Sequence, residues 1–397
     1  MFIGRKNEIE LLNGFYEGEE ASVAVVSGQI GIGKTTLLRE FAADKDAIFF
    51  EAYETTIKHQ LERLSKLMDV SKGLDAEEFC KEISKRAAKS KQLIIIDQYP
   101  HIVKADPEFD KLLRQYVTGE WKDLPVKLIL CSDAFMLVDK YIKGKKAIWK
   151  DAIALDLVIE PLGFYESCQF FDDASPMEAA FLYGITGGIP HNLARTAALL
   201  NVSGFEEYAL KPVDGEDRVK EVAIRLFLDK NSALGINPEK IMATELRELA
   251  YYNYMLTTLA KGLNRVNQIS AEVEKPKDVV VPYLNSLMSI GVCTKDTAIT
   301  EITNRKKTRY SIVNTSTLFW YKLIVPFYDE YIAGNAEALW QSSQTRVTGM
   351  LLRRYESKVT RIQMEGICTI STFPRAVPER SLTTASKSPI LWSMARR

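Results

Sequence analysis

The sequence has few of the residues that build disulfide or zinc frameworks. It contains five cysteines and three histidines in 397 residues, with no CxxC pair and no histidine cluster. A disulfide-stabilised secreted scaffold is therefore excluded, and a zinc cluster is not expected. A cysteine nucleophile stays formally possible, but none of the five lies in a recognisable catalytic setting, so we expect structural thiols.

Long apolar runs and an excess of one charge are also absent. No apolar run approaches the roughly 18 residues of a membrane span, and no secretory apolar segment is recognisable. Lysine plus arginine number 52, as do aspartate plus glutamate, so the formal net charge is zero. A zero net charge excludes a protein that coats nucleic acid with a surface that is basic throughout, although local charged patches can exist in a neutral protein. We expect a cytoplasmic protein of about two or three domains without a membrane segment.

Short apolar runs alternate with amphipathic stretches of helical length over the first 160 residues. The apolar runs lie at 23–26, 47–50, 93–96, 126–131 and, more weakly, 153–159. The amphipathic stretches lie at 55–69, 76–89, 107–117 and 133–142. Uninterrupted apolar strands alternating with helices predict an α/β domain with a parallel sheet covered on both faces.

A glycine-rich loop follows the first apolar run and precedes a predicted helix. It matches GxxxxGK(S/T) in full with Gly28, Gln29, Ile30, Gly31, Ile32, Gly33, Lys34 and Thr35, followed by Thr36. Glycines let backbone N–H groups turn toward a phosphate chain, and the next helix presents its positive end. We expect Lys34 to reach the β- and γ-phosphates and Thr35 to bind Mg²⁺. The predicted ligand is ATP (or ADP), since no guanine-reading segment is apparent.

A second anchor should come from a carboxylate at the end of another strand. Asp97 follows the run 93–96 and fits this Walker B position as a metal ligand; the alternative is an aspartate that only caps its loop. Gln98 comes next, and its amide can orient water but cannot accept a proton. The candidate catalytic residues are thus Lys34, Asp97 and Gln98, and we expect slow hydrolysis.

Four further polar residues follow predicted strands. Glu51 and Glu54 could supply the missing base if the strand at 47–50 neighbours the P-loop strand; otherwise they are loop carboxylates. Ser132 or Asp133 could sense the γ-phosphate, cap the next helix, or do both.

Helices dominate after Pro161. Ser175 followed by Pro176 is a typical helix start. Farther on, three predicted helices and alternating runs around a basic tip indicate a winged helix. The expected segments are an ATPase core at 1–160, a helical lid at 161–235, a winged helix at 236–333 and a truncated or poorly ordered tail at 334–397.

Several of these segments together resemble one family, the prokaryotic, archaeal-type P-loop ATPases of the AAA+ and STAND groups. They are Phe2–Glu8 (FIGRKNE), the P-loop, IIIDQYP around Asp97, LILCSDAFM, the turn Gly187-Gly188-Ile189-Pro190 and Leu318-Phe319-Trp320-Tyr321. The resemblance covers roughly residues 1–333. It implies an ATPase core of the ASCE type, a lid and a winged helix, with adenine contacts at Gly4, Arg5 and Pro190. Arg195 could act as a phosphate sensor on the lid; a solvated helix arginine is the simpler alternative.

The sequence departs from the family pattern in three places. Gln98 replaces the usual glutamate. No arginine lies in the segment 147–151. This absence weakens the case for an arginine that acts on the nucleotide of a neighbouring subunit, and it favours a monomer or dimer. We expect the restriction-endonuclease-like domain of longer members to be missing, because the end of the sequence from about Gln363 holds no DxE-x-K cluster. A basic binding arm is the alternative for this tail.

The wing tip carries four cations, Arg305, Lys306, Lys307 and Arg309, that could contact DNA phosphates. The candidate recognition helix from Lys275 is poor in the side chains that read bases. We therefore favour an intramolecular or protein-docking role, with the protein as a nucleotide-controlled switch. The alternatives are an ATP-liganded winged-helix DNA-binding regulator and, less favoured, a P-loop kinase, for which no substrate base is apparent.

Overall fold

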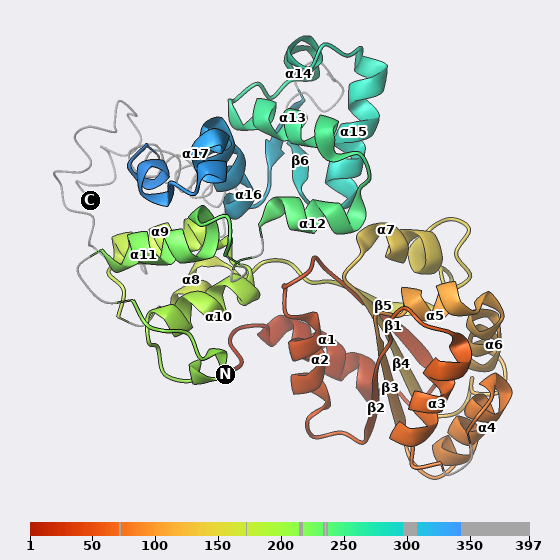
Figure 1. Ribbon diagram of the computed structural model, residues 1–397. Coiled ribbons are helices and arrows are strands. Elements are labelled where there is room, and N and C mark those ends of the chain that lie inside the picture. Colours follow the sequence, from red (N-terminus) through yellow and green to blue (C-terminus); the bar gives the residue numbers. More distant parts are fainter. Residues whose placement is uncertain are drawn as a thin grey trace, which may run out of the picture.

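The computed structural model describes residues 1–70, 73–171, 173–213, 217–232, 235, 237–296 and 308–342. The described chain forms an α/β domain, residues 1–160, and a helical lobe, residues 162–342 (Figure 1). No helix among these residues has the length and apolar character needed to cross a bilayer.

A five-stranded sheet in the order β2-β3-β4-β1-β5 forms the centre of the α/β domain. Its strands are β1 (Ser22–Ser27), β2 (Ala47–Glu51), β3 (Gln92–Asp97), β4 (Val126–Ser132) and β5 (Ile153–Val158). All neighbouring pairs are parallel. Every residue of β3 and β4 is buried, as expected of uninterrupted apolar strands with both faces covered. The predicted α/β class with a parallel sheet is confirmed.

Helices cover both faces of this sheet. They are α1 (Lys6–Glu17), α2 (Lys34–Ala42), α3 (Ile57–Leu67), α4 (Ala76–Ala87), α5 (Pro100–Ala105), α6 (Pro107–Thr118) and α7 (Phe135–Val138), which continues as a π-helical turn over Asp139–Lys143. Alternate strand residues point to opposite faces. Ala24 and Val26 pack with α1 and α2, whereas Val23 and Val25 pack with the core that contains α3 to α6.

The helical lobe begins with α8 (Phe164–Cys168), α9 (Pro176–Thr186), α10 (Pro190–Leu199), a 3₁₀ turn (Glu206–Tyr208), α11 (Arg218–Ala223) and a π-helical turn (Ile224–Leu228). The helix start at Ser175-Pro176 is confirmed: the Ser175 hydroxyl accepts a bond from the Glu178 N–H, and the Glu178 carboxylate accepts one from the Ser175 N–H. This reciprocal capping satisfies two of the N–H groups that a helix start leaves without partners.

The rest of the lobe comprises α12 (Pro238–Glu245), α13 (Leu249–Ala260), α14 (Val266–Glu272), α15 (Lys277–Ser289), β6 (Cys293–Asp296), β7 (Arg309–Ile312), α16 (Thr315–Phe319), a π-helical turn (Trp320–Ile324), a 3₁₀ turn (Val325–Phe327) and α17 (Tyr328–Ala333). Strands β6 and β7 pair antiparallel. Three helices followed by this pair have the element order of a winged helix, and that assignment stays a prediction.

One continuous hydrophobic core holds the helical lobe together. It includes Leu182 and Leu193 from the lid segment, Leu284 from α15, and Leu339 and Trp340 after α17. The expected boundaries at residues 235 and 334 therefore do not coincide with breaks in this core. The start of α16 also contacts the end of α9, where the Asn314 amide donates to the Gly187 carbonyl at 2.9 Å.

Candidate functional site

The glycine-rich loop takes a conformation that depends on its glycines. Strand β1 ends at Ser27 and α2 begins at Lys34, as the motif predicts. Gly31 and Gly33 have φ values of 77° and 87°, in the left-handed region that favours glycine. A Cβ added at Gly28 would lie 2.8 Å from the Ile159 carbonyl oxygen. The loop thus leads directly into the positive end of α2, where helix geometry favours an anion.

Lys34 holds a buried cation beside this loop. Its ammonium donates to the Gly28 carbonyl at 2.8 Å and the Gln29 carbonyl at 3.1 Å, and the residue is only 5% exposed. Burial lowers the pKa of Lys34, an effect that the nearby Cys131, Asp133 and other acidic groups oppose. A bound polyanion would offset this desolvation and stabilise the charged ammonium.

A short hydrogen bond joins the loop to the third strand. The Thr35 hydroxyl donates to Oδ2 of Asp97 at 2.5 Å, although the two residues lie 62 positions apart. Asp97 is 1% exposed and ends β3, with β4 between it and β1. Hydroxyl and carboxylate oxygens are ligands that Mg²⁺ prefers, so this pair fits a magnesium ion.

Gln98 lies where the sequence predicts it, on the wall of the pocket beside Lys34 and Thr35. Its backbone N–H donates to Oδ1 of Asp97 at 2.9 Å. Its φ of 57° is uncommon for a residue with a side chain, and such strain gathers at functional sites. The side chain at this position is a neutral amide, which cannot act as a general base.

The N-terminal segment and the lid turn meet the same loop. Arg5 donates to the Ile32 carbonyl at 3.1 Å and pairs with Glu8 at 2.9 Å. On the lid side, the His191 N–H donates to the Gly31 carbonyl at 3.1 Å. Pro190 begins α10, and its ring would lie 3.7 Å from a Cβ at Gly33. The three segments expected to surround a nucleotide therefore lie together.

These segments enclose a pocket of about 340 Å³. Predicted residues on its wall are Arg5, Ile30, Gly31, Ile32, Gly33, Lys34, Thr35, Thr36, Gln98 and Pro190. Gly4, Gly28, Gln29 and Asp97 are not on that wall. Gly4 (φ 73°) lies close to Glu166, because an added Cβ would come within 2.7 Å of its carboxylate.

Sequence reasoning missed the aromatic part of the pocket. Phe2, Phe170, Phe205 and Tyr208 line it. Arg195 lines it too: its guanidinium lies 5.2 Å from the Tyr208 ring centroid and donates to Nδ1 of His191 at 3.1 Å. Arg195 thus lies on the pocket wall with its side chain partly buried, and a role as phosphate sensor stays a prediction. No sequence signal marks Phe205 and Tyr208, because they lie in a connection without periodicity.

The remaining polar candidates separate into two groups. Asp133 lines the pocket, while Ser132 is buried and accepts from the Ala134 N–H at 3.2 Å, which is a local turn contact. Glu51 and Glu54 are exposed. Strand β2 lies at the sheet edge, with β3 and β4 between it and β1. The strand before these glutamates is therefore not a neighbour of the P-loop strand, which their role as a base required.

The predicted DNA-contacting tip lies mostly outside the described residues. Arg305, Lys306 and Lys307 belong to that part of the chain. Arg309 is exposed at the start of β7, opposite Asp296. DNA contact through this tip stays a prediction.

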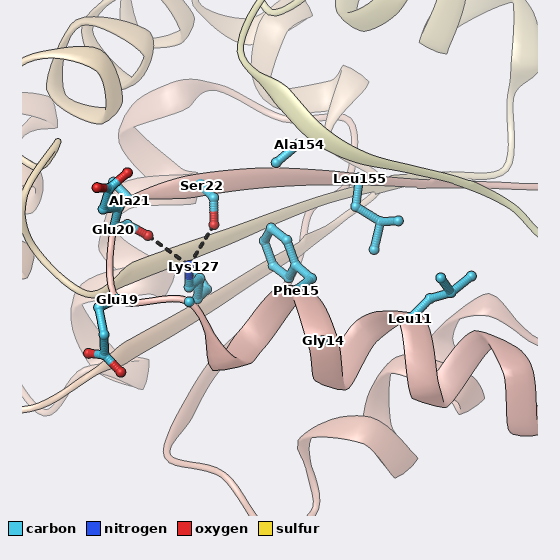
Figure 2. Close-up of a pocket in the computed structure, with 11 residues that line it drawn as sticks. Leu11, Gly14, Phe15, Glu19, Glu20, Ala21, Ser22, Lys127, Ala154 and Leu155 are labelled. Carbon is cyan, nitrogen blue, oxygen red and sulfur yellow. Dashed lines mark hydrogen bonds between the residues drawn. The ribbon is translucent and has the colours of Figure 1, made fainter.

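A second cavity, of about 670 Å³, lies at the opposite end of the sheet, where β1 begins. Figure 2 shows its buried cation, Lys127, which donates to the Glu20 carbonyl and the Ser22 hydroxyl, both at 2.7 Å. Two of the three ammonium protons are therefore already bonded. None of the predicted site residues lies here, so the pocket around Lys34 is the candidate site.

Comparisons with known proteins concern the family and the fold. Residues 2–196 match a family model described as an ATPase domain predominantly from Archaea. An uncharacterised protein of Methanocaldococcus jannaschii, MJECL04, is 25% identical over 327 residues, which cover 82% of this chain and 69% of that protein.

Solved structures show the same fold. The Walker-type ATPase PABY2304 of Pyrococcus abyssi matches with a TM-score of 0.56 at 16% identity, over 81% of this chain and 96% of that one. The ORC2 protein of Aeropyrum pernix, solved as ADPNP–ADP complexes, matches with a TM-score of 0.54 at 15% identity, over 83% and 94%. Residues 2–196 therefore match a family of ATPase domains, and the chain has the fold of P-loop ATPases.

Proposed function

We propose that this protein binds ATP with Mg²⁺, hydrolyses ATP slowly, and uses the bound nucleotide to set the placement of the helical lobe against the α/β domain. The observation that carries this proposal is the bond from Thr35 to Asp97 at 2.5 Å. It brings a P-loop hydroxyl and a strand-end carboxylate into one buried pair, as a magnesium–nucleotide site requires.

The α/β domain supplies the groups for the phosphate chain. The loop before α2 and the helix end offer N–H donors, and the Lys34 ammonium adds a positive charge in a buried setting. Thr35 and Asp97 would hold Mg²⁺, which when bound neutralises charge on the phosphates. Lys34 then stabilises negative charge that develops on the transferring phosphoryl group.

The helical lobe supplies the apolar end of the pocket. Phe170, Phe205 and Tyr208 present aromatic rings, and Pro190 adds an apolar wall. Flat aromatic and apolar surfaces suit a nucleobase, whose ring faces are themselves apolar. Together with Arg5, these residues support adenine binding between the N-terminal segment and the lid.

The neutral amide at position 98 supports slow hydrolysis. A water molecule that attacks phosphorus must lose a proton, and a glutamate at this position could accept it, whereas Gln98 can only orient the water. Hydrolysis without general-base help should be slower by a factor of about 10² or more.

Contacts across the pocket support the switch. The His191 N–H bonds to the Gly31 carbonyl, so the P-loop and the lid share a hydrogen bond at the phosphate end. Because α9, α10 and the later helices share one core, a shift at His191 would move the helical lobe as a unit.

Calorimetry with Mg-ATP tests the binding. Lys34→Met should weaken binding about 100-fold, since it removes the buried ammonium that would pair with the phosphates. The apolar side chain of methionine keeps the packing of the lysine stem. Lys127→Met is the matched control, because Lys127 is a second buried lysine at the far end of the same sheet. Absence of binding heat in the parent protein, or equal affinity in Lys34→Met, would contradict the proposal.

A further inference from the structure

A carboxylate of the helical lobe holds the loop that follows β4. Glu245, the last residue of α12, accepts from the Phe135 N–H at 2.6 Å and from the Met136 N–H at 3.0 Å. One carboxylate thus binds two successive backbone amides across the junction between the two parts of the chain. Figure 1 shows the end of α12 next to α7 at this junction.

Two further contacts make the junction specific. The Ser289 hydroxyl of α15 lies 3.8 Å from the Met136 sulfur, and the Phe135 side chain packs against the core of the helical lobe. Asp133, two residues before Phe135, lines the pocket beside Lys34. The loop 133–136 therefore has one end on the phosphate side of the pocket and the other end bonded to Glu245.

Glu245 also belongs to the electrostatic environment of the pocket. Burial raises the pKa of its carboxyl, the two bonded amides lower it, and Asp133 and Lys34 act on it with opposite signs. A phosphate chain in the pocket adds negative charge near these groups. Each additional phosphate therefore repels the carboxylates of Asp133 and Glu245 more strongly.

We propose that Glu245 is a specificity-determining residue that disfavours a nucleoside triphosphate relative to a diphosphate, and that a triphosphate in turn weakens the bonds from Glu245 to the loop 133–136. This inference rests on the proposed nucleotide binding. Thermodynamic linkage makes the two effects equal in size. If the bonds from Glu245 lower the triphosphate-to-diphosphate affinity ratio by some factor, the third phosphate weakens those bonds by the same factor.

Calorimetry with Mg-ADP and with Mg-AMPPNP, a non-hydrolysable ATP analogue, tests the first effect. Glu245→Gln removes the charge and keeps the shape, and Glu245→Ala removes both. Each should raise the AMPPNP-to-ADP affinity ratio by roughly fivefold. Glu178→Gln is the matched control, because Glu178 bonds to Arg218 within the helical lobe, away from the pocket. It should leave the ratio unchanged.

Hydrogen exchange at residues 134–138 tests the second effect. Exchange should be slower with Mg-ADP than with Mg-AMPPNP in the parent protein, and Glu245→Ala should speed it with either nucleotide. An unchanged affinity ratio in both Glu245 variants, or equal exchange with the two nucleotides, overturns this inference and leaves the proposed function standing. If the parent protein binds neither nucleotide, the proposed function fails and this inference fails with it.

Discussion

The α/β domain and the helical lobe are organised in different ways. The sheet separates the α/β domain into two cores, one on each face, and places polar residues at the carboxyl ends of its strands. The helical lobe has no such divider, and one core runs from Leu162 to Trp340. The first part therefore places its polar groups at the ends of strands between two cores, whereas the second packs around one shared core.

This difference assigns separate tasks at the shared pocket. Lys34, Thr35 and Asp97 come from the α/β domain and are positioned by the sheet. Tyr208 and Arg195 come from the helical lobe, and their distance from the P-loop depends on how the lobe packs against the α/β domain. The proposed phosphate-binding groups thus come from one domain, whereas the complete pocket depends on the contact between the two parts.

The largest expected effect tests whether the helical lobe is one unit. Leu284→Ala in α15 creates a cavity in its core and should cost about 3 kcal/mol. Because the core is continuous, hydrogen exchange should show lost protection as far away as α9 and α10, with β1 to β5 unchanged.

The matched variant is Leu113→Ala, which opens a similar cavity under the sheet, since Leu113 is equally buried in α6. It should loosen the α/β domain and leave the helical lobe protected. Loss of protection confined to residues 249–296 in Leu284→Ala would show that the lid and the later helices are independent, and the comparison would fail.

A smaller effect concerns the chemistry of the α/β domain alone. Gln98→Glu places a proton acceptor next to Asp97 and should raise single-turnover ATP hydrolysis at least about tenfold. Affinity for Mg-ADP should change little, because the phosphate-binding groups are untouched. If the parent protein already turns over at ordinary ATPase rates and the substitution adds nothing, the interpretation of Gln98 is wrong.

The sequence predicted the α/β domain well because its signals are local. Most of the strands contain a short apolar run, and the P-loop is contiguous, so Lys34 and Thr35 needed no knowledge of the tertiary fold. Asp97 could be placed because it ends a buried strand. Strand order could not be read in this way, which is why the role considered for Glu51 depended on a neighbour relation that the sheet does not have.

Apart from Pro190, the helical-lobe side of the pocket could not be predicted, for the same physical reason. Tyr208 lies in a 3₁₀ turn, and Glu245 lies at the end of a short helix. Neither position carries a periodic or motif signal. Their contacts are tertiary: Tyr208 lies against Arg195, and Glu245 accepts from the amides after β4, which lie far from it in the chain.

The smallest expected effect compares ion pairs in the two parts. Glu178 accepts from Arg218 at 3.0 Å, with its side chain 28% exposed, and chiefly this bond lowers the pKa of Glu178 from 4.5 to about 2. A depressed carboxyl pKa stabilises the fold above pH 4.5, and the contribution is lost as pH falls from 4.5 toward 2.

Glu178→Gln should remove this pH dependence. Solvent screening limits the contribution to about 1 kcal/mol, so denaturation between pH 7 and pH 3 should show the parent protein losing up to that much more stability than the variant. The control is Glu77→Gln in α4 of the α/β domain, whose pair with Lys81 at 2.7 Å is far more open, with side chains 61% and 57% exposed. It should follow the parent curve, because water already solvates both partners. A Glu178→Gln curve parallel to that of the parent would mean that the capping carboxylate contributes no more than an ordinary surface charge, and the helical lobe would then depend on its apolar core alone.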